Sequence, residues 1–92
     1  MFVVISYDVF DDRRRQRVLE FLKGQGAHVQ GSVFECELTE RQFATVLAGL
    51  RDRIDGRTDD VRCYLLDAAA VRRIRVLGSG RVSREPTHYL VG

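Results

Sequence analysis

Several features are scarce in this chain, and each absence disfavours a class of protein. Its two cysteines, Cys36 and Cys63, form no CxxC pair, and its two histidines have no metal-ligand spacing to them. We therefore expect reduced core thiols and no zinc site. No apolar run approaches the roughly 18 residues of a membrane span, and no basic region followed by a long apolar stretch is present. A membrane or exported protein is disfavoured, so we expect a cytoplasmic one.

Motifs of several enzyme and binding classes are also missing. The sequence has no GxSxG elbow, no GxxxxGK loop and no HExxH pair, which argues against a serine hydrolase, a nucleotide hydrolase and a zinc protease. The aromatic signature that an RNA-recognition module carries on its strands is absent as well. Any chemistry must therefore come from a less common arrangement of side chains.

Size and charge narrow the remaining choices. A chain of 92 residues buries only about 60 to 65% of its unfolded surface, so we expect a single domain over residues 1–92. The net charge is +2, but residues 71–92 hold five arginines and one acidic residue, whereas residues 1–70 hold ten basic and twelve acidic ones. This asymmetry suits a polyanion or an acidic partner surface. Solubility alone is the alternative explanation.

The first half of the chain predicts a strand, a helix and an extended segment. Residues 2–7 are apolar, β-branched and aromatic, as expected of a central strand. Asp11 or Asp12 can cap a following helix that ends at Gly24 or Gly26. Residues 28–38 alternate again and are interrupted by Gly31 and Ser32, which predicts one kinked strand or a very short hairpin.

The second half predicts one strong helix and further strands. Thr39 and Gln42 form a capping box, and apolar residues recur at helical spacing as far as Ile54. Residues 61–65 alternate as a strand, and residues 73–76 alternate as another after a link of three alanines. Residues 88–91 have the composition of a short strand that can pair with a second protomer.

This order of elements predicts an α+β fold. It fits a ferredoxin-like sandwich, in which two helices cover one face of an antiparallel sheet. Both faces of the first strand are apolar, so we expect the uncovered face to form a dimer. The segment 79–92 is expected at this dimer interface, with a C-terminal strand that reaches the partner.

The end of the first strand is the best candidate for chemistry. Asp8 follows an apolar run, so its carboxylate should be partly desolvated and held in position by the strand. Mg²⁺ can be bound by one or two protein carboxylates together with water and substrate phosphate. A two-fold dimer would supply Asp8 twice. A role in a turn or in helix capping is the alternative.

Arginines follow this carboxylate closely in sequence. Arg13, Arg14 and Arg15 lie in the first helical turn, where cations oppose the helix macrodipole, and Arg17 continues the basic run. The placement suggests that these side chains bind an anion such as phosphate. A solvated charged face is the alternative.

Three further side chains are supporting candidates. Tyr7 can orient the site or stack on a base, although a strand tyrosine is more commonly a core residue with its hydroxyl satisfied. Ser32 and Phe34 have the same two interpretations.

Three segments together resemble a known family, CRISPR-associated protein 2. They are the strand end at 7–9, the arginine-rich helix start ending at Arg17 and Val18, and the Val-Gln-Gly-Ser-Val-Phe-Glu segment at 29–35. The resemblance covers nearly the whole chain. It implies a homodimer of ferredoxin-like protomers in which the C-terminal strand reaches the partner's sheet.

The resemblance also implies a function. Members of that family act in the adaptation step of prokaryotic antiviral immunity, where integrase subunits flank the dimer and foreign DNA is inserted into the CRISPR array. They are described as magnesium-dependent endonucleases on RNA or double-stranded DNA. Carried onto this chain, the metal ligand is Asp8, and Tyr7, Arg15, Arg17 and Phe34 support it.

Three functional hypotheses remain open at this point. The first is a nuclease in which Asp8 from each protomer holds magnesium against a phosphate. The second is a non-catalytic dimeric scaffold whose arginines bind duplex DNA and which bridges integrase subunits. The third is a small regulatory domain that binds a metabolite or a protein, which the segment 29–35 disfavours.

Overall fold

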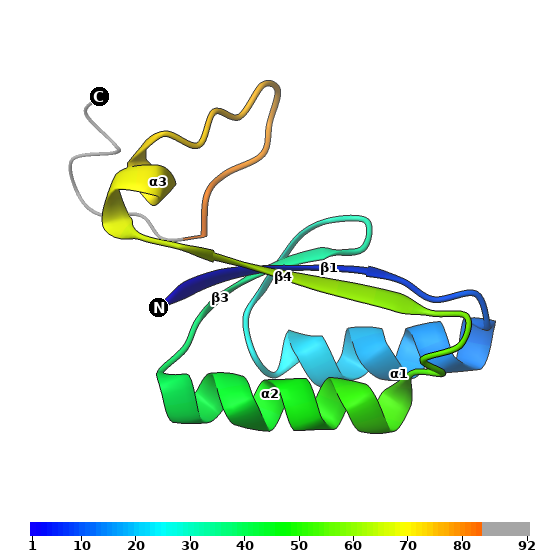
Figure 1. The fold of residues 1–92 in the computed structure, drawn as a ribbon. Helices are drawn as coiled ribbons and strands as arrows, with labels where there is room; N and C mark the ends of the chain where they lie inside the picture. The colour runs from blue at the N-terminus through cyan, green and yellow to red at the C-terminus, as the bar shows by residue number, and fades with distance from the viewer. Residues whose placement is uncertain (84–92) are drawn as a thin grey trace.

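A computed structural model describes residues 1–83 of the chain, and its core is one antiparallel sheet with two helices against one face (Figure 1). The elements are, in chain order, β1 (Phe2–Asp8), α1 (Asp12–Lys23), β2 (Ala27–Gln30), β3 (Val33–Glu37), α2 (Glu40–Arg53), β4 (Asp60–Leu66) and α3 (Ala68–Arg72). The predicted ferredoxin-like α+β architecture is confirmed.

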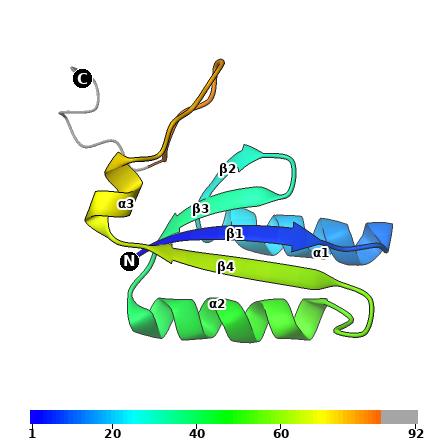
Figure 2. The same cartoon turned by 45° about the horizontal axis from the view of Figure 1, so that its top comes forward.

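The sheet has the strand order β2-β3-β1-β4, with every neighbouring pair antiparallel (Figure 2). β1 therefore has a hydrogen-bonded strand on each side, as expected of a central strand. Its residues Val3, Ile5 and Tyr7 join the core beneath α1 and α2. Alternation along the strand then places Val4, Ser6 and Asp8 on the opposite face, which we call the open face.

Both long helices begin and end where the sequence predicts. Asp11 caps α1 by accepting a hydrogen bond from the backbone amide of Arg14 at 2.9 Å, and Gly24 is the C-cap. Thr39 caps α2, and the reciprocal capping box with Gln42 is complete. Each helix buries only a narrow apolar stripe against the sheet, made of Val18 and Leu22 in α1 and Val46 and Leu50 in α2.

The extended segment after α1 is a hairpin, the second of the two predicted alternatives. β2 and β3 pair with an irregularity between His28 and Gln30. Gly31 has a φ of 29°, in the left-handed region that favours glycine, and so provides the tight turn. The turn fixes which residues of β3 face the helices.

The predicted strand at residues 73–76 is wrong. Asp67 accepts a hydrogen bond from the backbone amide of Ala70 at 2.7 Å and begins the short helix α3. Arg73 is its C-cap, and residues 74–83 have no regular secondary structure. Alternating residues make a strand only where a neighbouring strand can pair with them, and among residues 1–83 none lies beside this segment. The predicted strand at 88–91 and most of the segment 79–92 lie outside the described residues.

The open face is partly covered by the chain itself. α3 lies on the side of the sheet away from α1 and α2, near the start of β1 (Figure 1). Phe2 is only 1% exposed. Further along the chain, the backbone amide of Ser83 donates to Glu35 Oε1 at 2.7 Å, which places Ser83 against β3. Part of the apolar surface predicted to need a partner is therefore covered within the chain.

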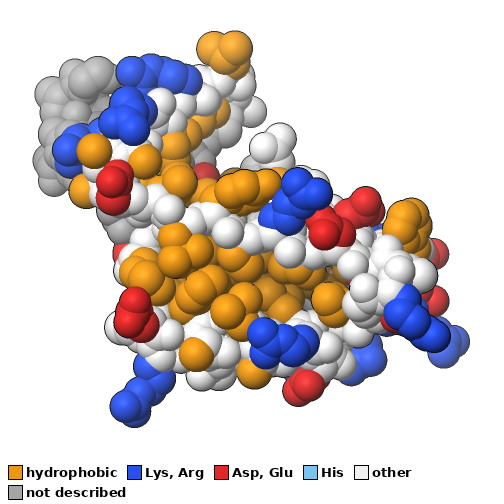
Figure 3. Space-filling model, viewed as in Figure 1, with side chains coloured by type: hydrophobic (Ala, Val, Ile, Leu, Met, Phe, Trp, Pro, Cys, Tyr) orange, Lys and Arg blue, Asp and Glu red, His pale blue; other side chains and the backbone are white. Residues whose placement is uncertain are grey.

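The outer edge of β4 is open in the described part of the chain. Tyr64 and Leu65 are 49% and 51% exposed. Hydrophobic side chains gather in a band between this strand and α2 (Figure 3). In residues 1–83, no helix has the length and apolar character needed to cross a membrane.

Candidate nuclease site and basic groove

Asp8 is the last residue of β1 and lies on the open face. Its side chain is exposed, so the expected partial desolvation is wrong. The carboxylate makes no hydrogen bond or ion pair with any other residue in 1–83. Directly opposite it in the β4 register is Asp60, so two carboxylates flank the same point of the sheet. Asp60 accepts from Arg62 Nε at 2.9 Å, and Arg62 is the nearest cation along that strand.

Tyr7 lies on the other face of β1 from Asp8. It is 6% exposed, belongs to the core and stacks near Phe34, with ring centroids 6.4 Å apart. Burial raises the pKa of the Tyr7 phenol, although Arg15 opposes the shift. The neighbouring backbone links the strands, because the amide of Tyr7 donates to the carbonyl of Ser32 at 3.1 Å. The role of Tyr7 beside Asp8 in catalysis, by orienting the site or stacking on a base, stays a prediction.

Phe34 is completely buried in β3, and His28 stacks on it with a centroid separation of 4.6 Å and an interplanar angle of 8°. Ser32 is half-buried in the turn. Phe34 belongs to the core on the helix-covered side of the sheet, whereas Ser32 contacts β1 through its backbone carbonyl. The supporting roles predicted for Ser32 and Phe34 stay predictions.

Arg14 is occupied by an internal ion pair. Its Nε and Nη2 donate to the two carboxylate oxygens of Asp59 at 2.9 and 3.1 Å, a bidentate geometry, and the Asp59 side chain is fully buried. Asp59 also accepts from the backbone amides of Phe10 and Asp55 at 3.3 and 2.8 Å. The Arg14 guanidinium and these amides hold the pKa of Asp59 well below its ordinary value. Arg14 thus ties the start of α1 to the loop before β4.

Arg15 points back towards the end of β1. Its Nη1 donates to the carbonyl of Val9 at 3.1 Å, and its Nη2 pairs with Asp12. Of the four predicted arginines, it is the one whose hydrogen bonds connect it to the strand end that carries Asp8.

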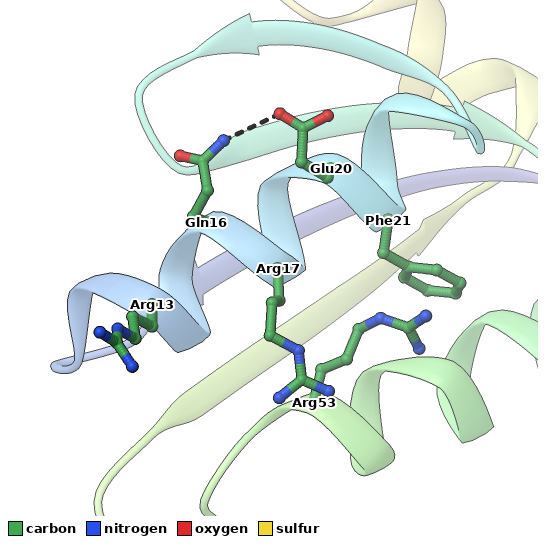
Figure 4. A pocket seen from close by; sticks show the side chains of 6 residues that line it. All are labelled: Arg13, Gln16, Arg17, Glu20, Phe21 and Arg53. Atoms are coloured by element: carbon green, nitrogen blue, oxygen red, sulfur yellow. Dashed lines mark hydrogen bonds between the residues drawn. The ribbon is translucent and has the colours of Figure 1, made fainter.

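Arg13 and Arg17 lie elsewhere, in a groove of about 640 Å³ on the outer surface of the helical layer. The other lining residues are Gln16, Glu20, Phe21 and Arg53, the last from α2 (Figure 4). Arg13 and Arg17 form no ion pair with a residue in 1–83. The predicted cluster of four arginines beside Asp8 is therefore divided among three environments.

Sequence reasoning missed Asp60 and Arg53. Asp60 stands 52 positions after Asp8, and only the β1–β4 register brings the two together. Arg53 belongs to the last turn of α2, where a cation is favourable for the helix dipole. Its position in the sequence therefore gives no sign of a binding role. The only available signal was the amphipathic pattern that makes α1 and α2 neighbours.

The residues around Asp8 fit some metal sites better than others. Residues 1–83 contain no group of three or more His, Cys, Asp or Glu side chains suited to holding a metal ion. A closed zinc cage is thus absent from the described part. One free carboxylate with a second directly across the strand pair does fit Mg²⁺, which keeps several waters and takes one or two protein carboxylates.

The thiols behave as the composition predicts. Cys36 and Cys63 are free. Burial raises the pKa of Cys36 to about 11 and also raises that of Cys63, so both are protonated core groups at neutral pH.

Comparisons with known proteins agree with the predicted resemblance. The family model "CRISPR associated protein Cas2" matches residues 1–74. A Chloroflexus aurantiacus protein named CRISPR-associated endoribonuclease Cas2 3 is 48% identical over 91 residues, which cover 99% of this chain and 98% of that protein.

Solved structures show the same relationship. Streptococcus pyogenes Cas2 is similar with a TM-score of 0.76 and 36% identity, over 85% of this chain and 100% of that one. A hypothetical protein from Thermus thermophilus is similar with a TM-score of 0.80 and 34% identity, over 90% and 96%. On this evidence the chain belongs to the CRISPR-associated Cas2 family.

Proposed function

We propose that this protein is a CRISPR-associated endonuclease that hydrolyses phosphodiester bonds at the open face of its sheet. The observation that carries the proposal is the exposed, unpaired carboxylate of Asp8 at the strand end, directly opposite Asp60. The relatives' shared name, endoribonuclease, favours RNA as the substrate, and double-stranded DNA is the alternative.

Asp8 is the residue that would hold Mg²⁺, with Asp60 as a second carboxylate. When bound, the ion would polarise a phosphate and lower the pKa of a coordinated water. Asp8 has no ion-pair partner in residues 1–83 and stands across the strand pair from a second carboxylate, so a bound cation would also relieve like-charge repulsion. Arg62 pairs with Asp60 and offers a positive charge to substrate phosphate on the same face.

The homodimer predicted from the sequence has a structural basis in β4. Among residues 1–83 this strand is at the edge of the sheet, so no described strand pairs with the outer side of β4, where Tyr64 and Leu65 are exposed. A second copy that pairs near this edge would cover the apolar band of Figure 3. It would also supply a second Asp8.

The scaffold hypothesis keeps one specific argument. Arg13 and Arg17, two of the predicted nucleic-acid contacts, lie on the opposite side of the sheet from Asp8, so binding and cleavage need not occur at one place. In that case the protein acts in spacer acquisition by bridging integrase subunits on duplex DNA. The two functions are compatible in one molecule.

The deciding experiment measures cleavage of labelled single-stranded RNA and double-stranded DNA, with and without Mg²⁺, by wild type and Asp8→Asn. We expect Mg²⁺-dependent cutting that falls by about 100-fold or more in the variant, as loss of a group acting on the transition state does. Asp52→Asn is the matched control, because Asp52 is an exposed residue of α2.

Two results would count against the nuclease. One is the absence of cutting by wild type on both substrates, and the other is equal cutting by wild type and Asp8→Asn. Mg²⁺ binding to wild type and its loss in Asp8→Asn, followed by calorimetry, provide a second readout that does not depend on turnover.

A further inference from the structure

The groove between α1 and α2 is a surface of concentrated positive charge. Three arginines line it, Arg13 and Arg17 from α1 and Arg53 from α2, against the single carboxylate of Glu20. That carboxylate is already engaged, since it accepts from Gln16 Nε2 at 2.8 Å and pairs with Lys23 Nζ at 3.6 Å. The groove therefore offers an excess of unneutralised positive charge.

Arg53 is held in position before any ligand arrives. Its guanidinium carbon lies 4.2 Å from the centroid of the Phe21 ring, and its Nη1 donates to the carbonyl of Gly49 at 2.8 Å. Stacking and one hydrogen bond restrict the rotamers of a side chain that otherwise loses much entropy on binding. The remaining donors of the planar fork make no hydrogen bond with residues 1–83, which is the arrangement that suits phosphate.

The two arginines of α1 that line the groove are spaced to contact two phosphates of one nucleic-acid strand. Arg13 and Arg17 are four residues apart, so they lie on one face of the helix about 6 Å apart along its axis. One strand of a duplex carries a phosphate about every 3.4 Å along its axis. Arg13 and Arg17 can thus engage separate phosphates of one strand, with Arg53 across the groove in α2 (Figure 4).

The chemistry favours a backbone contact over base recognition. The one aromatic ring of the groove, Phe21, is covered by Arg53 and is not free to stack on a base. Guanidinium groups without base-directed partners bind phosphate and carry no sequence preference. An acidic protein surface would present single carboxylates rather than the regular phosphate repeat.

We propose that the α1–α2 groove binds the phosphodiester backbone of nucleic acid, with Arg53 as its central contact, on the side of the sheet opposite Asp8. This inference rests on the proposed function only in that nucleic acid is the ligand, and it does not require cleavage. It adds a binding surface that spans two helices and a residue outside the basic run of α1.

The test is fluorescence-anisotropy binding of labelled RNA and duplex DNA of unrelated sequences, without Mg²⁺, over a range of salt. We expect Arg53→Gln and Arg17→Gln each to weaken binding about five- to tenfold for all sequences and to lower the salt slope by roughly one. Arg51→Gln is the matched control, because Arg51 is in the same last turn of α2 but does not line the groove. It should retain wild-type binding.

Arg53→Lys separates charge from packing, since it keeps the charge and loses the fork. It should recover part of the affinity, and a melting curve for each variant shows whether folding is intact. Arg17 has no hydrogen bond or ion pair with a residue in 1–83, so Arg17→Gln tests the groove without loss of an internal contact.

The outcomes distinguish this inference from the proposed function. Wild-type binding that falls equally in Arg53→Gln and Arg51→Gln would overturn the groove while leaving the nuclease intact. Cleavage lost in Asp8→Asn with binding retained supports two separate surfaces. Competition by polyglutamate as strong as by an unlabelled oligonucleotide would overturn phosphate recognition.

Discussion

The two surfaces of this protein, the open face of the sheet and the outer surface of the helices, have opposite electrostatic character. The open face ends in Asp8 and Asp60, and of these two carboxylates only Asp60 has an ion-pair partner in residues 1–83, Arg62. The helical surface has a groove with Arg13, Arg17 and Arg53. A substrate phosphate is repelled at the first surface without a cation and attracted at the second. The difference suggests that metal-dependent chemistry and metal-independent binding occur on separate sides of one small domain.

The ion pair between Arg14 and Asp59 links the helix of the groove to the start of β4. Arg14 comes from the same helix as the groove arginines, and its partner Asp59 immediately precedes Asp60 at the start of β4. Replacing Asp59 should therefore disturb both surfaces together, whereas replacements on one surface should leave the other unchanged. The following predictions test this difference.

The largest effect is expected for Asp59→Asn. The amide cannot accept two hydrogen bonds from Arg14, and it leaves a partly buried guanidinium unpaired, so the melting temperature should fall by on the order of 10 °C. Thermal unfolding followed by circular dichroism measures it, with Asp52→Asn as the control. An unchanged melting temperature would show that the bidentate pair contributes little.

Asp59→Asn should also change how the stability of the protein depends on pH. Arg14 lowers the pKa of Asp59 in the folded protein, and Arg57 lowers that of Asp55 to about 2. The stability from these groups is present above the unfolded-state pKa of about 3.9 and is lost as pH falls towards 2. Wild type should lose more stability than Asp59→Asn over that acid range. Parallel curves for the two proteins would contradict this assignment.

A smaller effect is expected at Asp60. If it assists Asp8, Asp60→Asn should lower Mg²⁺-dependent cleavage about tenfold while leaving anisotropy binding unchanged. Arg62→Gln provides the comparison, because it breaks the same ion pair and keeps the carboxylate. Equal cleavage by wild type and Asp60→Asn would leave Asp8 as the one ligand of each protomer.

The smallest effect is expected at Gly49. A Cβ there would overlap the ring of Phe21, so Gly49→Ala must move the ring on which Arg53 rests. The better helix propensity of alanine, about 1 kcal/mol, offsets part of the packing cost. Nucleic-acid binding should weaken two- to threefold with cleavage chemistry intact. Gly56→Ala, where a Cβ meets no atom within 4 Å, is the control and should bind normally.

Most of the fold was predictable because its signals are local. The caps Asp11 and Thr39, the apolar stripes of both helices and the turn at Gly31 each depend on residues a few positions apart. The strand at residues 73–76 was wrongly predicted because that prediction, too, used only a local signal. Alternation is a local pattern, but a strand exists only beside another strand, and Asp67 instead begins a helix.

The candidate site was predictable only in part. Asp8 was found because an acidic residue after an apolar strand is conspicuous in any sequence. Its exposure, and the burial of Tyr7 and Phe34 on the other side of the sheet, depend on which face the helices cover. Arg13, Arg14, Arg15 and Arg17 look equivalent in sequence, yet the helical period of 3.6 residues sends them in different directions.

The sequence by itself determined that β1, α1, an extended segment, α2 and β4 follow one another, where α1 and α2 begin and end, and the family resemblance, to which residues 29–35 contribute. Only the tertiary structure decided that Asp60 stands opposite Asp8 and that Arg14 forms an ion pair with Asp59. It also decided that Arg53 lines one groove with arginines of α1. The physical reason is that capping and periodicity act within one or two turns of chain. Strand register and helix packing instead join residues about 35 to 50 positions apart, whose proximity no local pattern records.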